Sequence, residues 1–195
     1  MIYNDIIYGG VELERIEIDP VELSARLGIK RESESIDISN AMQTFSHSAS
    51  YRFAYVKVPV SVNKGVCDFS FASVESDSLA KVLSASSEAI ILAVSAGINL
   101  DRQISRLHIK KSADAYILDA IGSAAVESLA DYINAEICNG LNTTKRFSPG
   151  YADFPLSFQK DLLERLNAQK TVGISLNDKL LMIPMKSITA VIGVK

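Results

Sequence analysis

Ser112-Ala-Asp-Ala-Tyr-Ile-Leu-Asp-Ala-Ile-Gly-Ser-Ala-Ala-Val-Glu-Ser-Leu-Ala-Asp-Tyr-Ile-Asn-Ala-Glu-Ile-Cys138 is the longest helical repeat in this 195-residue chain. Its apolar side chains recur three or four positions apart, as on a helix that packs against a core. This stripe consists of Leu118, Ile121, Ala125, Leu129, Ile133 and Ile137. Asn139-Gly140 then predicts the end of the helix. The stretch therefore predicts one long central helix.

A neighbouring face of the same helix combines small and acidic side chains. It carries Ala120, Ser123, Ala124, Glu127 and Asp131. Small residues around Glu127 allow another backbone or a ligand to approach closely. A solvated acidic face on an ordinary amphipathic helix is the alternative that the pattern leaves open.

The remaining segments predict paired strands interleaved with short helices. Strands are expected over residues 11–18, 51–62, 67–74, 89–94 and 182–194, the last split at Pro184. Short helices are expected over residues 20–28, 39–45, 77–83 and 155–168, with Asp19 and Asp77 as caps of the first and third. Since no regular βαβ repeat occurs, the fold class is α+β: an antiparallel sheet, a long central helix and several shorter helices.

The stretch Arg146-Phe-Ser-Pro-Gly-Tyr151 lies between two predicted helices and concentrates polar chemistry. Pro149 has a fixed φ and no backbone donor, whereas Gly150 permits conformations that a side chain would block. These two residues can hold Arg146 and Tyr151 in a fixed relation around a small anionic or zwitterionic ligand. An ordinary Pro-Gly turn with a surface arginine remains the alternative reading of the spacing.

This motif resembles the Arg-x-x-x-Gly-Tyr signature of the activation (reactivation) domain of vitamin B12-dependent methionine synthase, which binds S-adenosylmethionine. Three further segments are similar to that family in the same order: residues 88–97 followed by 100–102, residues 120–132, and residues 173–177 followed by 182–193. The resemblance implies an S-adenosylmethionine-binding core over residues 86–195. Residues 1–85 match weakly and are expected to form an N-terminal α/β part of the same domain.

The resemblance also implies a ligand site made by Glu127, Arg146, Ser148, Pro149, Gly150 and Tyr151. S-adenosylmethionine needs a guanidinium for its carboxylate and a carboxylate for its ammonium or ribose. Arg146 and Glu127 supply those groups, the main chain of the loop is available to the adenine, and Tyr151 by analogy faces a corrin ring. Asp19 and Asp37 are candidates for an acidic ligand residue that the family carries nearer its N-terminus.

No catalytic side chain is predicted, because no nucleophile stands beside a base and no Gly-x-Ser-x-Gly, Walker or dinucleotide-binding motif occurs. In the mechanism that the resemblance implies, the cofactors carry the bond-making chemistry. Cobalamin on a partner, oxidised to inactive cobalt(II), receives an electron from a flavodoxin- or reductase-type donor and takes the methyl group of S-adenosylmethionine. The Asp-x-His-x-x-Gly sequence of cobalamin-binding modules is absent, so we expect action in trans.

The resulting hypothesis is a stand-alone reactivation subunit of cobalamin-dependent methionine synthase, active only with a cobalamin-carrying partner. Reactivation of another corrinoid methyltransferase is one alternative. A non-catalytic accessory protein that caps a corrinoid methyltransferase is the other. Ligand binding and methylation of a partner's cobalamin would separate these possibilities.

Composition argues against several other classes of protein. A net charge of -3, with no cluster of basic residues, gives no electrostatic footprint for nucleic acid. Cys67 and Cys138 lack a CxxC motif and a histidine at ligand spacing, so we expect small buried thiols and no protein-bound metal. No apolar run approaches ~20 residues and no signal sequence is visible, so we expect a cytoplasmic protein without a membrane segment.

Overall fold

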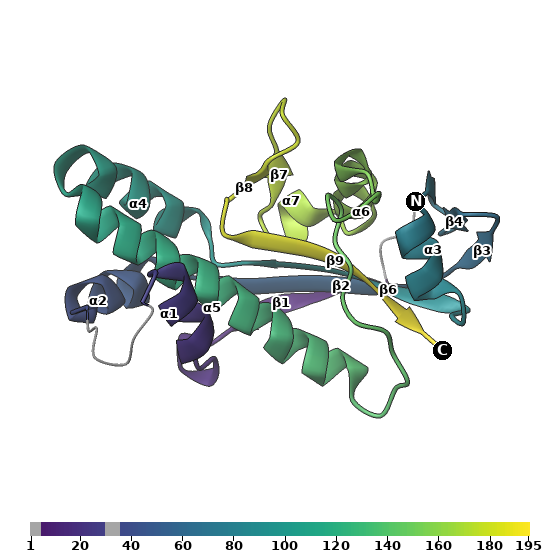
Figure 1. Ribbon diagram of the computed structural model, residues 1–195, viewed down its shortest axis with the longest axis horizontal. Coiled ribbons are helices and arrows are strands. Elements are labelled where there is room, and N and C mark those ends of the chain that lie inside the picture. The colour runs from purple at the N-terminus through teal and green to yellow at the C-terminus, as the bar shows by residue number, and fades with distance from the viewer. Residues whose placement is uncertain (1–4, 30–35) are drawn as a thin grey trace.

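An antiparallel sheet of four strands forms the centre of the structure, a computed structural model that describes residues 5–29 and 36–195 (Figure 1). The strands follow the order β1-β2-β6-β9. They comprise Ile7–Val11, Tyr51–Pro59, Glu88–Ser95 and Ser187–Val194. Every neighbouring pair in this sheet is antiparallel, which confirms the α+β class.

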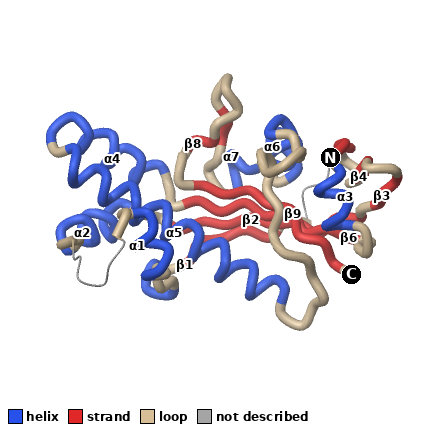
Figure 2. Tube along the Cα trace, viewed as in Figure 1, coloured by secondary structure: helices blue, strands red, loops and turns tan. Residues whose placement is uncertain are grey.

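Helices cover both faces of this sheet, as Figure 2 shows. The helices packed with one face are α1 (Pro20–Arg26), α2 (Ser39–Ser48), α4 (Ile98–Lys110) and α5 (Ser112–Cys138). Those packed with the other are α3 (Asp77–Leu83), α6 (Gln159–Arg165) and α7 (Ala168–Thr171). Two small sheets lie beside the main one: β3 (Ser61–Asn63), β4 (Val66–Asp68) and β5 (Ser73–Glu75), and β7 (Ser175–Leu176) with β8 (Met182–Ile183).

Strand β6 explains why the sheet needs cover on both faces. Its side chains alternate between two cores: Ile91 packs on the α6 side, while Ile90 and Leu92 pack on the α5 side. From Ala89 to Ser95 every residue of the strand is buried. A strand buried on both faces reads as a continuous apolar run, which is what the sequence shows.

The long helix α5 crosses one face of the sheet diagonally and supplies the core on that side (Figure 1). Most of the predicted stripe is completely buried: Leu118, Ile121, Ala125 and Leu129 have no exposed surface, and Ile133 is nearly so. Ile137 is partly buried, near the end of the helix. The predicted long central helix is therefore confirmed, together with the face that it buries.

The core on the opposite face is rich in phenylalanine. The rings of Phe69 and Phe154 lie 5.6 Å and 5.7 Å, centroid to centroid, from the ring of Phe158. Leu79 of α3 and Leu162 of α6 are fully buried in the same cluster. This core fixes the loop that follows α5, because Phe154 belongs to that loop.

The two edges of the main sheet differ. After α5 the chain turns back and runs beside β9, where Thr143 pairs with Val194 and Phe147 with Val191 (Figure 1). Mutual backbone hydrogen bonds of 2.9 Å join Phe147 and Val191. Strand β1 forms the other edge. The segment that contains the Arg146 motif is therefore part of the sheet's framework.

Several predicted boundaries are wrong in informative ways. The strand expected over residues 11–18 begins earlier, as β1, and is followed by a 3₁₀ turn at Leu13–Arg15. Residues 51–62 pair mainly with β1 and β6, and only the β3 part pairs with β4. The strand expected over 67–74 is interrupted by a turn in which the Phe69 amide donates to the Ala72 carbonyl.

Helix limits also needed correction. Ser76, and not Asp77, caps α3, since its Oγ accepts the Leu79 amide at 3.1 Å. The helix expected over 155–168 splits into a 3₁₀ turn at Leu156–Phe158 and α6, and Asn167 adopts a left-handed backbone before α7. The helix expected over 39–45 continues to Ser48.

Candidate functional site

Arg146 reaches α5 because of the alternation in the segment that pairs with β9. Phe147 turns toward the α6-side core, where its ring stacks on Phe154 with centroids 5.9 Å apart and planes at 9°. Adjacent side chains of an extended segment point to opposite sides. Arg146 therefore projects the other way, toward α5.

The guanidinium of Arg146 forms ion pairs with two acidic residues of α5. Arg146 Nη2 lies 2.7 Å from Asp131 Oδ1 and 3.4 Å from Glu127 Oε2. The side chain of Arg146 is 19% exposed, that of Glu127 37% and that of Asp131 74%. Nη2 alone makes these contacts, so Nη1 and Nε keep donors for a further partner.

The turn after Arg146 is built by backbone hydrogen bonds. Gly150 has φ +91°, a conformation that favours glycine, and its amide donates to the Phe154 carbonyl at 2.8 Å. The Tyr151 amide donates to the Ser148 carbonyl at 3.3 Å. Pro149 is buried beneath this turn, whereas the Tyr151 side chain stays exposed. The proline and glycine thus act through the backbone, as their residue types predict.

Asp153 ties the end of this turn to α3. Its carboxylate accepts hydrogen bonds from Ser76 Oγ and from the amides of Asp77 and Ser78 at 2.8, 2.7 and 3.1 Å. Hydrogen bonds from the Ser78 and Ser76 side chains, followed by those from the backbone, lower the pKa of Asp153 to about 2. A charged aspartate therefore anchors the loop two residues after Tyr151.

A cavity of about 430 Å³ opens between α5 and this loop. It is lined by Glu127, Asp131, Asn134, Lys145, Arg146, Phe147, Ser148, Tyr151 and Ile188. Two acidic and two basic residues line it together, and Tyr151 adds an aromatic side chain. Such a balance suits a ligand that carries both signs of charge.

The charged residues of the cavity continue a polar row along α5. Asp119, Ser123, Glu127 and Asp131 follow one another at four-residue spacing, which places them on one side of the helix. Lys186 Nζ lies 2.7 Å from Asp119 Oδ1 and donates to Ser123 Oγ at 2.8 Å. Lys186, the residue before β9, and Arg146, in the segment that pairs with β9, thus join this row to the edge of the sheet.

Four of the six predicted site residues line this cavity: Glu127, Arg146, Ser148 and Tyr151. Pro149 and Gly150 do not line it and shape the turn instead. The prediction did not include Asp131, Asn134, Lys145, Phe147 and Ile188, which line it too. The four-residue spacing between Glu127 and Asp131 was the signal that could have added Asp131.

The two candidates for an N-terminal acidic ligand residue accept backbone amides at helix starts: Asp19 is the N-cap of α1, and Asp37 precedes Ile38, the N-cap of α2. Asp19 Oδ1 accepts the Val21 amide at 2.8 Å, and the Asp19 amide donates to Ser128 Oγ at 3.1 Å. Asp37 Oδ1 accepts the Ser39 amide at 2.9 Å. Neither residue lines the Arg146 cavity.

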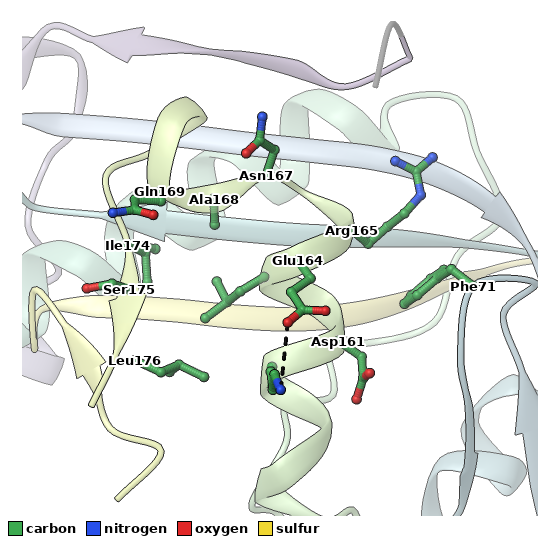
Figure 3. A pocket seen from close by; sticks show the side chains of 12 residues that line it. Phe71, Asp161, Glu164, Arg165, Asn167, Ala168, Gln169, Ile174, Ser175 and Leu176 are labelled. Carbon is green, nitrogen blue, oxygen red and sulfur yellow. Dashed lines mark ion pairs between the residues drawn. The ribbon is translucent and has the colours of Figure 1, made fainter. Parts of the chain in front are cut away.

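A second cavity, of about 460 Å³, lies on the other side of the molecule between α6, α7 and β7 (Figure 3). Its wall mixes apolar residues such as Leu163, Ile174 and Leu176 with charged and polar residues of α6 and the turn that follows it. Among its lining residues, Lys160 pairs with Glu164 at 3.9 Å through exposed side chains on successive turns of α6, and Arg165 pairs with Asp5, which does not line the cavity. The Arg146 cavity is the better candidate site, because its charged groups converge from separate elements.

Over the described ranges, no group of three or more His, Cys, Asp or Glu side chains is arranged to hold a metal ion. Cys67 is buried, as predicted, whereas Cys138 is only half-buried. Within residues 5–29 and 36–195, no helix is long and apolar enough to cross a membrane.

Comparison with known proteins gives a structural match and no sequence match. No family model matches the chain, and no curated protein matches it. Among solved structures, the crystal structure of the MetH reactivation domain bound to AdoHcy is similar, with a TM-score of 0.71. The match covers 96% of this chain and 78% of that one, at 12% sequence identity. The chain therefore has the fold of the MetH reactivation domain.

Proposed function

We propose that the cavity between α5 and the Arg146 loop binds S-adenosylmethionine, and that the protein presents this methyl donor to a corrinoid partner. The observation that carries the proposal is the convergence of Arg146, Glu127 and Asp131 in one cavity. The fold adds support, since the similar MetH domain is bound to AdoHcy, the demethylated form of the same molecule.

The cavity has suitable size and chemistry for such a ligand. Its volume of about 430 Å³ falls in the range of roughly 300–1,000 Å³ that small-molecule sites occupy. The Nη1 and Nε donors of Arg146, which pair with none of residues 5–29 and 36–195, can take the ligand carboxylate as a charge-assisted pair. The carboxylates of Glu127 and Asp131 suit the ammonium group and the sulfonium.

The chain's own residues then bind and orient the ligand. The Ser148 turn offers backbone carbonyls to the adenine amino group, while the Gly150 and Tyr151 amides and Asp153 hold that turn in place. When bound, S-adenosylmethionine supplies a sulfonium methyl group, which a corrinoid on the partner accepts after one-electron reduction. Catalysis here consists of positioning, because no side chain of this protein needs to form a bond.

Tyr151 marks the side from which a partner would approach. Its side chain is 66% exposed although it lines the cavity mouth. An exposed aromatic ring beside a binding cavity suits contact with a flat apolar surface such as a corrin. We propose cobalamin-dependent methionine synthase modules or another corrinoid protein as the partner, with a flavodoxin- or reductase-type electron donor.

Calorimetric titration of S-adenosylmethionine into the purified protein tests the first step. Arg146→Ala should weaken binding by about 1.5–3 kcal/mol through loss of a charge-assisted hydrogen bond. Arg146→Lys should recover only part of that loss, because an ammonium cannot form the planar, two-donor contact. Arg106→Ala, on the exposed side of α4, is the matched control and should bind like the wild type.

Anaerobic methyl transfer to a separately purified corrinoid module tests the second step. With a reductant present, the wild type should convert the cobalt(II) form to the methylated form, and Arg146→Ala should slow this conversion. Binding without any methyl transfer would favour a non-catalytic accessory protein. Saturable binding that is equal in the wild type and Arg146→Ala would remove the Arg146 cavity from the proposal.

A further inference from the structure

The shortest contact of the Arg146 guanidinium is with an exposed residue. Asp131 Oδ1 lies 2.7 Å from Nη2, compared with 3.4 Å for Glu127 Oε2. Yet the Asp131 side chain is 74% exposed, whereas the Arg146 side chain is 19% exposed. The guanidinium is fixed in the cavity wall, and the carboxylate that touches it most closely stands at the surface.

The Asp131 carboxylate is chemically the same group as the carboxylate of an amino-acid ligand. Ion pairs with one exposed partner change equilibria by less than about fivefold, because water screens them and the side chain gains freedom on release. Asp131 can therefore leave Arg146 at little cost. Glu127 is the more enclosed of the two carboxylates, since its side chain is half as exposed as that of Asp131.

We infer that Asp131 competes with the ligand carboxylate for Arg146 and thereby sets the selectivity of the cavity. A ligand carboxylate that binds Nη1 and Nε shares the positive charge of the guanidinium with Asp131, and it gains the whole of that charge only when Asp131 leaves Nη2. A ligand without a carboxylate does not use Arg146 and gains nothing from that displacement. Once displaced, Asp131 remains at the cavity mouth as a negative charge, which favours the sulfonium of S-adenosylmethionine over the neutral sulfur of S-adenosylhomocysteine.

This inference rests on the proposed function for its choice of ligands, and Asp131→Asn tests it. The change keeps the side chain's shape and removes its charge at an exposed position. We expect S-adenosylhomocysteine to bind the variant about two- to fivefold more tightly. Methylthioadenosine, which lacks the amino-acid end, should bind both proteins equally. The ratio of the dissociation constants of S-adenosylhomocysteine and S-adenosylmethionine should therefore be smaller for the variant than for the wild type.

Asp114→Asn is the matched control, because Asp114 is a half-exposed residue of the same helix that pairs with Lys111 at 3.7 Å, away from the cavity. It should bind all three compounds like the wild type. Unchanged or weaker binding of S-adenosylhomocysteine by Asp131→Asn would overturn the inference. Weaker binding in particular would make Asp131 a direct ligand contact.

A second probe separates this inference from the proposed function. If no adenosyl compound binds either protein, the proposed function fails, but acetate still offers a carboxylate to Arg146. The Arg146 Nε–H resonance, assigned with Arg146→Lys, should then shift at lower acetate concentration in Asp131→Asn than in the wild type. Identical acetate titrations would show that Asp131 does not compete for the guanidinium.

Discussion

The Ser76 hydroxyl donates to Asp153 Oδ1 across 2.8 Å, although the two residues are 77 positions apart in the sequence. Ser76 is also the N-cap of α3, so the helix start and the end of the Arg146 loop share one hydrogen-bonded cluster. The amides of Asp77 and Ser78 complete it. The candidate site is therefore anchored to an element that contributes nothing to the cavity itself.

Asp153→Asn should loosen this anchor. The carboxylate accepts from several donors at once, and an amide has one oxygen fewer with which to do so. We expect a melting temperature lower by a few degrees, together with weaker S-adenosylmethionine binding because the turn is less ordered. Thermal denaturation and calorimetry measure the two effects. Asp178→Asn, at an exposed turn, should change neither.

The same carboxylate predicts a dependence of stability on pH. Its pKa is lowered from 3.8 to about 2 in the folded protein, so its ionised form is favoured by folding. That contribution is complete above about pH 4 and disappears as the pH falls toward about 2. The melting temperatures of the wild type and Asp153→Asn should therefore converge over this range. A constant difference down to pH 2 would contradict the assignment.

Gly150→Ala should lower both the stability of the protein and its affinity for the ligand, because Gly150 shapes the turn beside the cavity. Gly150 has φ +91°, and an added Cβ would lie 3.4 Å from Leu156 Cδ1, which is ordinary contact. Strain at a positive φ should therefore dominate, at about 1–2 kcal/mol. Gly173→Ala, with φ +74° and open space, should lose similar stability without any loss of ligand affinity. Urea denaturation and calorimetry provide the comparison.

Lys186→Met should destabilise the junction of α5 and β9. The Lys186 side chain is 10% exposed and pairs with Asp119, whose side chain is 41% exposed. We expect a loss of about 2 kcal/mol, less than the 3–5 kcal/mol typical of a fully buried pair. Asp119→Asn and the double variant complete a cycle, and non-additive losses would show that the two residues interact.

The two thiols should differ in reactivity. Burial, and secondarily the charge of Asp153, raise the pKa of Cys67 to about 11, so its thiolate is scarce at neutral pH. Cys138 is half-buried near the end of α5. A thiol reagent should label one cysteine in the native protein and both in denaturant. Mass spectrometry of the labelled peptides should identify Cys138 as the reactive one.

The features that the sequence predicted well are those that depend on periodicity within one element. The α5 stripe and the apolar run of β6 were visible because each follows from the burial of that element alone. The segment after β1 shows the limit: Leu13 and Ile16 both pack on the α5-side core, although residues three apart lie on opposite faces of a strand. They do so through a 3₁₀ turn, in which residues three apart share a face.

The candidate site could be predicted only in part, because it depends on contacts between separate segments of the chain. Resemblance supplied Glu127 and Arg146, but their meeting depends on a chain reversal after α5 and on pairing with β9. Asp131 looked like one more charge on a solvated helix face. Only the position of the loop shows that its carboxylate, at 2.7 Å, is the closest one to the guanidinium.

The opposite directions of Arg146 and Phe147 have an evolutionary consequence. Phe147 pairs with Val191 and stacks on Phe154, so selection for a folded sheet edge would preserve it in any descendant. Arg146 pairs with the exposed Asp131, and such a pair adds little to stability. Selection for folding alone would therefore conserve Arg146 only weakly. Two adjacent residues are therefore under different selection: Phe147 for folding and Arg146 for ligand binding. In diverged relatives, an aromatic residue that persists beside a lost arginine would mark a lineage that kept the scaffold and abandoned the ligand.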